Sequence, residues 1–172
     1  IKKVKRIMDV GTGAGFPGVP LKIAFPHLEA CLLDSLKKRV NFLEETFDIL
    51  KLTDITAVHG RAEEYARNKA YRESFDLCVS RAVSNLATLS EYCLPYVKVG
   101  GSFISYKSGT VQEEAEQAEK AVKILGGKIK DVVYFSLPDS EIQRSLVVIE
   151  KVKSTPGKYP RKAGTPLKEP LV

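Results

Sequence analysis

The stretch Asp9-Val-Gly-Thr-Gly-Ala-Gly-Phe-Pro-Gly18 decides the fold of this chain. It continues the short apolar run 6–10, which is typical of a buried strand, and it leads into residues 17–25, whose spacing is helical with a proline early in the first turn. A strand that passes through three glycines into a helix is the ligand-binding turn of a doubly wound sheet. Because glycine lacks a Cβ atom, the backbone there can turn sharply and approach a ligand closely.

Strand and helix patterns alternate along the rest of the chain. Further strands are expected at 31–33, 55–58, 75–80 and 102–106, and further helices at 62–67, 85–94 and 111–125. Ser35 is expected to cap a helix with the apolar face Val40, Leu43, Phe47 and Leu50. The last two strands, 129–135 and 146–150, have no helical pattern between them and should pair antiparallel at the sheet edge. This order predicts a three-layer α/β sandwich with a mostly parallel sheet.

Composition is that of an ordinary globular domain, with 44% hydrophobic and 28% charged residues in 172. No apolar run approaches the roughly 18–20 residues of a membrane span, and no signal peptide is recognisable. The three cysteines, Cys31, Cys78 and Cys93, are isolated among apolar neighbours, which favours reduced thiols over disulfides or a metal site. We therefore expect a cytoplasmic monomer with one folded domain, residues 1–152, no metal and no membrane contact.

The net charge of +6 is concentrated at the C-terminus, where six basic residues from Lys151 onward face one acid, Glu169. Residues 153–172 are also rich in proline and glycine, which predicts an extended tail. A near-neutral body with a basic tail favours a polyanionic partner at one edge of the molecule. The alternative is a tail that only aids solubility.

The glycine loop and two acidic residues together predict the cofactor. Asp34 ends the second strand, 19 residues beyond Gly15, where a carboxylate can accept both hydroxyls of a ribose. The spacing of Gly11, Gly13 and Gly15 is G-x-G-x-G, which favours S-adenosylmethionine over a dinucleotide, and Asp9 can bind the ammonium group of its methionine part. Support of the following helix is the alternative role for Asp34. A dehydrogenase-like Tyr-x-x-x-Lys match at 65–69 comes too early in the chain and is treated as coincidence.

These residues resemble a known family, the bacterial small-subunit (16S) ribosomal RNA guanine-N(7) methyltransferases, called RsmG or GidB. The resemblance rests on five motifs in order, which together cover nearly the whole chain: Asp9–Pro20, Leu33–Leu43, His59–Glu63, Ser80–Val83 and Lys158–Pro166. It implies a Rossmann-like class I methyltransferase fold. It also implies an enzyme that transfers a methyl group from S-adenosylmethionine to N(7) of a guanine in 16S ribosomal RNA or in the small subunit.

The resemblance also implies roles for single residues. Gly11 and Phe16 contact the cofactor in the first loop, and Ala62 and Glu63 border its adenine. Arg81 faces the methionine end and positions the incoming base, without acid–base chemistry, because N(7) of guanine carries no proton. Lys107 lies on the same rim, and Lys158, Arg161 and Lys162 are expected to contact RNA phosphates while Tyr159 stacks on a base.

Two alternatives remain open from the residues alone. One is a small-molecule methyltransferase of the same fold, and the other is a non-catalytic RNA-binding module. The family carries a helical N-terminal segment before its first strand, and this chain begins almost at that strand. We therefore expect that segment to be absent here, with consequences for activity.

Overall fold

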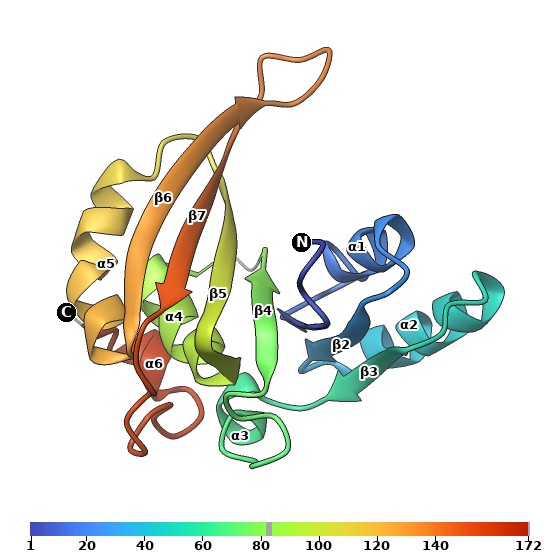
Figure 1. The fold of residues 1–172 in the computed structure, drawn as a ribbon, viewed down its shortest axis with the longest axis horizontal. Coiled ribbons are helices and arrows are strands. Elements are labelled where there is room, and N and C mark those ends of the chain that lie inside the picture. Colours follow the sequence, from blue (N-terminus) through green and yellow to red (C-terminus); the bar gives the residue numbers. More distant parts are fainter. Residues whose placement is uncertain (82–83, 172) are drawn as a thin grey trace.

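Residues 1–81 and 84–171 are described by the computed structural model in Figure 1; Ala82 and Val83, the end of the fourth motif, lie outside them, as does Val172. Within this part of the chain, seven strands form one sheet in the order β3-β2-β1-β4-β5-β7-β6. The strands are β1 Arg6–Val10, β2 Glu29–Asp34, β3 Ile55–His59, β4 Phe75–Ser80, β5 Val97–Ser108, β6 Gly127–Ser136 and β7 Gln143–Lys151. The helices are α1 Gly18–Ala24, α2 Lys37–Ile49, α3 Ala62–Tyr65, α4 Leu86–Cys93, the 3₁₀ turn Leu94–Tyr96, α5 Gln112–Ile124 and α6 Thr165–Lys168.

The sheet topology confirms the predicted fold. Strands β3, β2, β1, β4 and β5 run parallel, while β7 pairs antiparallel with both β5 and β6. The order reverses between β1 and β4, and in such sheets the ligand crevice lies at that switch point, beyond the carboxyl ends of the strands. The first glycine loop leaves β1 at this place. The fold therefore brings the predicted cofactor residues of separate motifs to one edge.

Each face of the sheet packs against its own pair of helices. Adjacent residues of β1 point to opposite faces, so that Ile7 joins the core under α1 and α2 while Met8 joins the core under α4 and α5. Both side chains are fully buried. This is the reason why the inner strands read as continuous apolar runs and not as an alternating pattern.

Two local predictions around α2 are wrong. The N-cap position is Leu36, not Ser35, and the backbone N–H of Leu36 instead donates to Asp34 Oδ1 at 2.9 Å. Leu50 was expected on the apolar face but is 47% exposed, because the helix ends at Ile49 and the chain turns away. The remaining face, Val40, Leu43 and Phe47, is buried as predicted.

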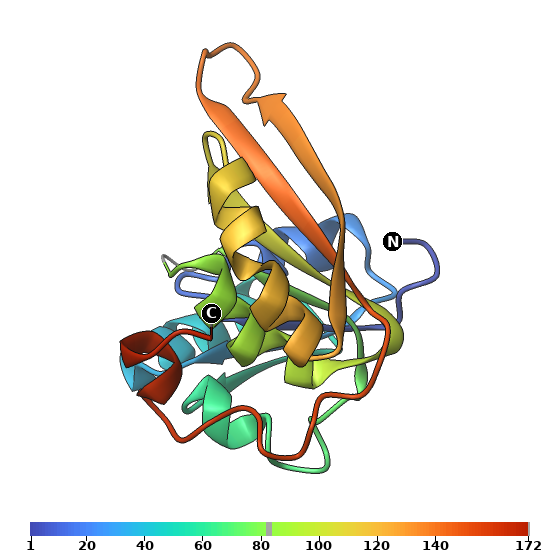
Figure 2. The same ribbon diagram turned by 90° about the vertical axis from the view of Figure 1, so that its left-hand side faces the viewer.

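The β6–β7 hairpin is the most protruding part of the molecule. Figures 1 and 2 show its turn extending well beyond the ends of the other strands. Three consecutive apolar residues of β6, Val133, Tyr134 and Phe135, are 41%, 45% and 38% exposed there. No helix of residues 1–81 and 84–171 is both long and apolar enough to cross a membrane.

Candidate active site

The loop after β1 depends on glycine for its shape. Gly11, Gly13 and Gly15 have φ angles of 70°, 63° and 94°, in the left-handed region that disfavours other residues. At Gly15 a Cβ atom would stand 2.6 Å from Val19 Cγ2, so that helix α1 closes directly against the loop. At Gly13, in contrast, nothing lies within 4 Å of that position. The loop is therefore packed on its inner side and open at Gly13.

Asp9 lies fully buried beneath this loop. Its Oδ2 accepts hydrogen bonds from Thr12 Oγ1 at 2.6 Å and from the backbone N–H of Gly18 at 2.8 Å. Its Oδ1 is buried and has no hydrogen-bond partner among the residues that the structure describes. Burial raises the pKa of Asp9 from 3.8 to about 6, against the hydrogen bonds of Thr12 and Gly18 and the nearby charge of Arg81, which lower it.

Asp34 holds the loop and the next helix together. Its Oδ2 accepts the Gly13 N–H at 2.9 Å and an Arg39 N–H at 3.3 Å, while Oδ1 accepts the Leu36 N–H. The helix-supporting role that the sequence left open is therefore real. Asp34 also lines a cleft at the ends of the strands, so that binding of ribose hydroxyls by its carboxylate stays a prediction.

A cleft opens at the carboxyl ends of β1, β2 and β3, where the predicted cofactor residues Gly11, Asp34, Ala62 and Glu63 meet. Its other walls are residues of the strand ends, the adjacent loops and α4: Val10, Leu33, Ser35, Gly60, Arg61, Ser84, Leu89 and Tyr92. Sequence reasoning missed Leu89 and Tyr92. They lie three residues apart on one face of α4, and such a pair is indistinguishable in sequence from an ordinary core stripe.

Arg81 and Phe16 lie together at the other end of the loop. The guanidinium of Arg81 stacks over the Phe16 ring, with 5.6 Å from Cζ to the ring centroid. Phe16 is 48% exposed, which is unusual for a large apolar ring and leaves a face open to a ligand. The structure thus brings together two predicted residues from motifs 65 positions apart.

Lys107, predicted to contact RNA, is occupied by protein groups. Its Nζ donates to the Ser84 carbonyl at 2.6 Å and to Glu114 Oε1 at 2.7 Å, and its side chain is 11% exposed. Glu114 Oε1 also accepts the Leu86 N–H at 2.6 Å, so that Lys107 and Glu114 fix the start of α4. Lys107 lines the same cavity as Arg81, as predicted, and its contact with RNA stays a prediction.

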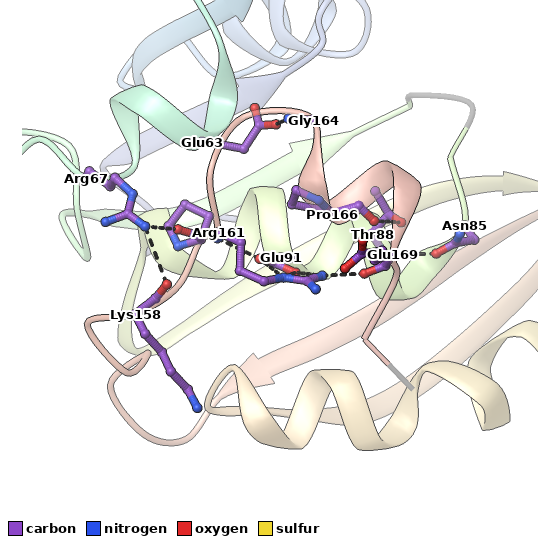
Figure 3. A network of polar contacts seen from close by, with 11 residues as sticks. Glu63, Arg67, Asn85, Thr88, Glu91, Lys158, Arg161, Gly164, Pro166 and Glu169 are labelled. Atoms are coloured by element: carbon purple, nitrogen blue, oxygen red, sulfur yellow. Dashed lines mark hydrogen bonds and ion pairs between the residues drawn. The ribbon is translucent and has the colours of Figure 1, made fainter.

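The C-terminal segment is folded against the domain, and the prediction of an extended tail is wrong. Figure 3 shows Arg161 bound to Glu91 of α4, which is fully buried; the shortest contact is 2.7 Å from NH2 to Oε2. Tyr159 is only 7% exposed, so it cannot stack on a base. Both residues were predicted to bind RNA, and both instead fasten the segment. Lys158 and Lys162 are exposed and keep that prediction.

The same segment reaches the cofactor cleft. The backbone N–H of Gly164 donates to Glu63 Oε1 at 2.8 Å, and Thr88 of α4 donates its hydroxyl to the Pro166 carbonyl at 3.0 Å (Figure 3). Glu63 is 4% exposed and points toward this segment. The position of Glu63 at the cleft is therefore set by residues 101 positions further along the chain.

The donor set fits S-adenosylmethionine. The loop offers open space beside Gly13 and a buried carboxylate oxygen of Asp9 without a hydrogen-bond partner among the described residues. The cleft adds the carboxylate of Asp34 and the apolar side chains of Leu89 and Tyr92, which suit an adenine. Among the described residues, no group of three or more His, Cys, Asp or Glu side chains is placed to hold a metal ion.

Comparison with known proteins gives a family. The family model described as rRNA small subunit methyltransferase G matches residues 1–147. Proteins named ribosomal RNA small subunit methyltransferase G are 58% identical in Lachnoclostridium phytofermentans and 52% identical in Clostridium novyi, each over 172 residues. Those matches cover 100% of this chain and 71% of each relative.

Solved structures share the fold. Pyrococcus horikoshii TYW2 in complex with MeSAdo matches with a TM-score of 0.68 at 13% identity, over 87% of this chain and 58% of that one. The S-adenosylmethionine-dependent methyltransferase SibL in its apo form matches with a TM-score of 0.65 at 16% identity, over 88% and 52%. The sheet and its helices are therefore those of class I methyltransferases.

Proposed function

Because this chain belongs to the rRNA small subunit methyltransferase G family, we propose that it transfers a methyl group from S-adenosylmethionine to N(7) of a guanine in 16S ribosomal RNA. The observation that carries the proposal is the convergence of Asp9, Gly13 and Asp34 at the switch point of a methyltransferase sheet. Family membership adds the ribosomal substrate. The choice of N(7) comes from the resemblance to the guanine-N(7) methyltransferases.

Residues of the cleft and of the neighbouring glycine loop have separate tasks in cofactor binding. Asp9 offers its free Oδ1 toward an ammonium group, and the open backbone at Gly13 admits the methionine part. Asp34 accepts from ribose hydroxyls, while Leu89 and Tyr92 enclose the adenine beside Ala62 and Glu63. Arg81, held over Phe16, faces the carboxylate of the methionine part or an RNA phosphate.

The main task of the protein in this reaction is to position the methyl group and the guanine next to each other. Bound S-adenosylmethionine supplies a methyl group on a positively charged sulfur. Attack by the N(7) lone pair of guanine would form the new N–C bond as the C–S bond breaks with its electron pair left on sulfur. No proton would move, so the protein's residues need not include a general base. Holding the two reactants in contact accounts for up to about 7–11 kcal/mol of barrier lowering. N(7) lies in the deep groove of an RNA helix, so the target base must be unpaired or extruded.

The partner follows from the same reasoning. The substrate is the small ribosomal subunit or its RNA, bound by exposed cations that include Lys158 and Lys162. The bacterial cytoplasm is the compartment in which that subunit is assembled, and the three buried free cysteines suit it.

The test is transfer of radiolabelled methyl from S-adenosylmethionine to small subunits and to extracted RNA, followed by nucleoside analysis. We expect label in 7-methylguanosine at one site. Asp34→Asn should abolish transfer by loss of cofactor binding, whereas Asp48→Asn, on the exposed side of α2, should match the unmodified chain. Label in another nucleoside, or transfer only to small molecules, would contradict the proposal.

A further inference from the structure

A second cavity lies beside the cofactor cleft, beyond the carboxyl end of β4. Its volume is about 860 Å³, and Ser84 lines both the cavity and the cleft. Strand β4 ends at Ser80, opposite Ser105, whereas β5 continues to Ser108 alongside the β6–β7 hairpin. β4 therefore ends before its neighbour β5 does, and the cavity lies in the space beyond the last residue of β4.

One wall of the cavity is a face of the sheet. Ser108, Arg144 and Phe135 stand opposite one another in a row across β5, β7 and β6. Tyr106, two residues before Ser108, shares their face because side chains alternate along a strand. All four residues line the cavity. The wall thus presents two aromatic rings and a guanidinium. Tyr106 and Ser108 come from β5, and Phe135 and Arg144 come from the β6–β7 hairpin, whose turn protrudes in Figures 1 and 2.

The charges of the cavity are divided between a compensated part and two cations. Lys107 and Glu114 both line it, and their ion pair at 2.7 Å cancels their charges. Arg81 and Arg144 also line it, and neither forms an ion pair with a carboxylate of the described residues. The cavity is therefore electrically compensated near Lys107 and positive at two points of its lining.

The cavity adjoins the end of the glycine loop at which Arg81 and Phe16 stack. Arg81 lines the cavity, and its Cζ lies 5.6 Å from the ring centroid of Phe16 in the glycine loop. Ser84 lines both the cavity and the cofactor cleft. A ligand in the cavity therefore lies next to the part of the cofactor cleft where the methyl group is expected.

We propose that this cavity is the acceptor-nucleotide site, in which the base stacks against Tyr106 and Phe135 and the flanking phosphates bind Arg81 and Arg144. The proposal rests on the proposed function. Methylation at N(7) leaves the base positively charged, so an uncompensated cation beside it would oppose the reaction. That is the physical reason for assigning both arginines to phosphates and for the pairing of Lys107 with Glu114. Aromatic stacking beside a cationic rim is the usual way to hold an unpaired nucleotide.

Steady-state methyl transfer to small ribosomal subunits, with Phe135→Ala and Arg144→Ala made in the full chain, tests the proposal. Each variant should raise KM for the subunit about tenfold or more. Their KM for S-adenosylmethionine should stay within about twofold of the unmodified chain, since neither residue lines the cofactor cleft. Phe135→Tyr should restore binding, and Arg144→Ala should also reduce the salt dependence of KM.

Two matched controls lie on the same strand. Tyr134 is as exposed as Phe135 but points to the opposite face of β6, and Lys130 is an exposed cation paired with Glu150. Neither lines the cavity, so Tyr134→Ala and Lys130→Ala should leave both KM values unchanged. If the unmodified chain methylates subunits, two results would overturn the assignment of this cavity without affecting the proposed function. One is an equal rise of KM in Phe135→Ala and Tyr134→Ala, and the other is an unchanged KM in both Phe135→Ala and Arg144→Ala. No transfer by the unmodified chain, despite cofactor binding, would overturn the proposed function and this site with it.

Discussion

At the scale of single residues, the buried carboxylate of Asp9 lowers the stability of the fold, and we propose that it binds the cofactor. Folding raises its pKa from 3.8 to about 6 because the carboxyl group is buried. Below pH 3.8, Asp9 is protonated in both the folded and the unfolded chain, so its burial has no ionisation cost. As the pH rises from 3.8 to about 6, Asp9 ionises in the unfolded chain first, and the free energy of unfolding falls. Above about pH 6 this loss stays on the order of 3 kcal/mol.

Asp9→Asn should therefore raise the free energy of unfolding at neutral pH and weaken cofactor binding about tenfold or more. The amide keeps an acceptor for Thr12 and Gly18 but lacks the negative charge. For the unmodified chain, cofactor affinity should fall as the pH drops below about 6, and this dependence should vanish in Asp9→Asn. Urea unfolding and calorimetric titration measure the two effects, and a variant that loses stability while keeping affinity would contradict the assignment.

The glycines of the loop differ in what they tolerate. Gly15→Ala should be strongly destabilising, because its Cβ would lie 2.6 Å from Val19 Cγ2 and 2.9 Å from Leu43 Cδ2, at a φ of 94°. Gly13→Ala, with open space around it, should cost only the left-handed backbone penalty of about 1–2 kcal/mol. Thermal unfolding of the two variants gives the comparison. Equal losses would mean that the contact with α1 and α2 does not matter.

At the scale of elements, a buried ion pair is one of the contacts that hold the C-terminal segment. Arg161→Ala would leave Glu91 without its cation in a fully buried position. We expect a loss of about 3 kcal/mol, the lower end for a buried pair, because the Arg161 side chain is 24% exposed. Cofactor affinity should fall as well, since Gly164 would no longer fix Glu63.

The neighbouring residue provides the control for that prediction. Lys162→Ala removes an exposed charge and should change stability by no more than about 0.5 kcal/mol. Arg161→Lys should fall between the two, because an ammonium group cannot reproduce the forked contact with both Glu91 oxygens. Equal stability of Arg161→Ala and Lys162→Ala in urea would show that the segment is not anchored this way.

At the scale of the whole molecule, the C-terminal segment completes the core below α4 and α5. Thr155 Oγ1 accepts from the Lys151 Nζ and donates to the Leu125 carbonyl, both at 2.7 Å. Lys151 is fully buried, and burial lowers its pKa to about 8. Tyr159 covers the same side of the core. The segment is thus part of the domain, which extends through residue 171 and not only to 152.

Truncation after Val152 should therefore destroy cooperative thermal unfolding, because Lys151 would lose a partner and the core would be uncovered. The control is the full chain with Lys158→Ala and Lys162→Ala, which loses two charges of the segment and keeps its packing. Circular dichroism melts distinguish them. A truncated chain with an unchanged melting temperature would restore the original expectation of a detached tail.

The sequence by itself determined the sheet, its order of elements and the first loop. These depend on local rules: apolar runs form strands, glycines mark the left-handed turn, and Asp34 follows a strand at a set spacing. The resemblance in five motifs added the family, which the comparisons bear out. Both are properties that can be read from neighbours in the chain.

The tertiary structure alone decided what the charged and aromatic residues do. Arg161, Tyr159 and Lys107 look like RNA contacts in a basic sequence. In the fold, Arg161 pairs with the buried Glu91, Tyr159 is buried against the core, and Lys107 pairs with Glu114. Leu89, Tyr92 and Phe135 look like core residues, but the fold brings the first two to the cofactor cleft and Phe135 to the neighbouring cavity. The physical reason is that the role of a charged or aromatic side chain depends on its burial and on its partners. Both are determined only when strands and helices that are distant in the chain pack together.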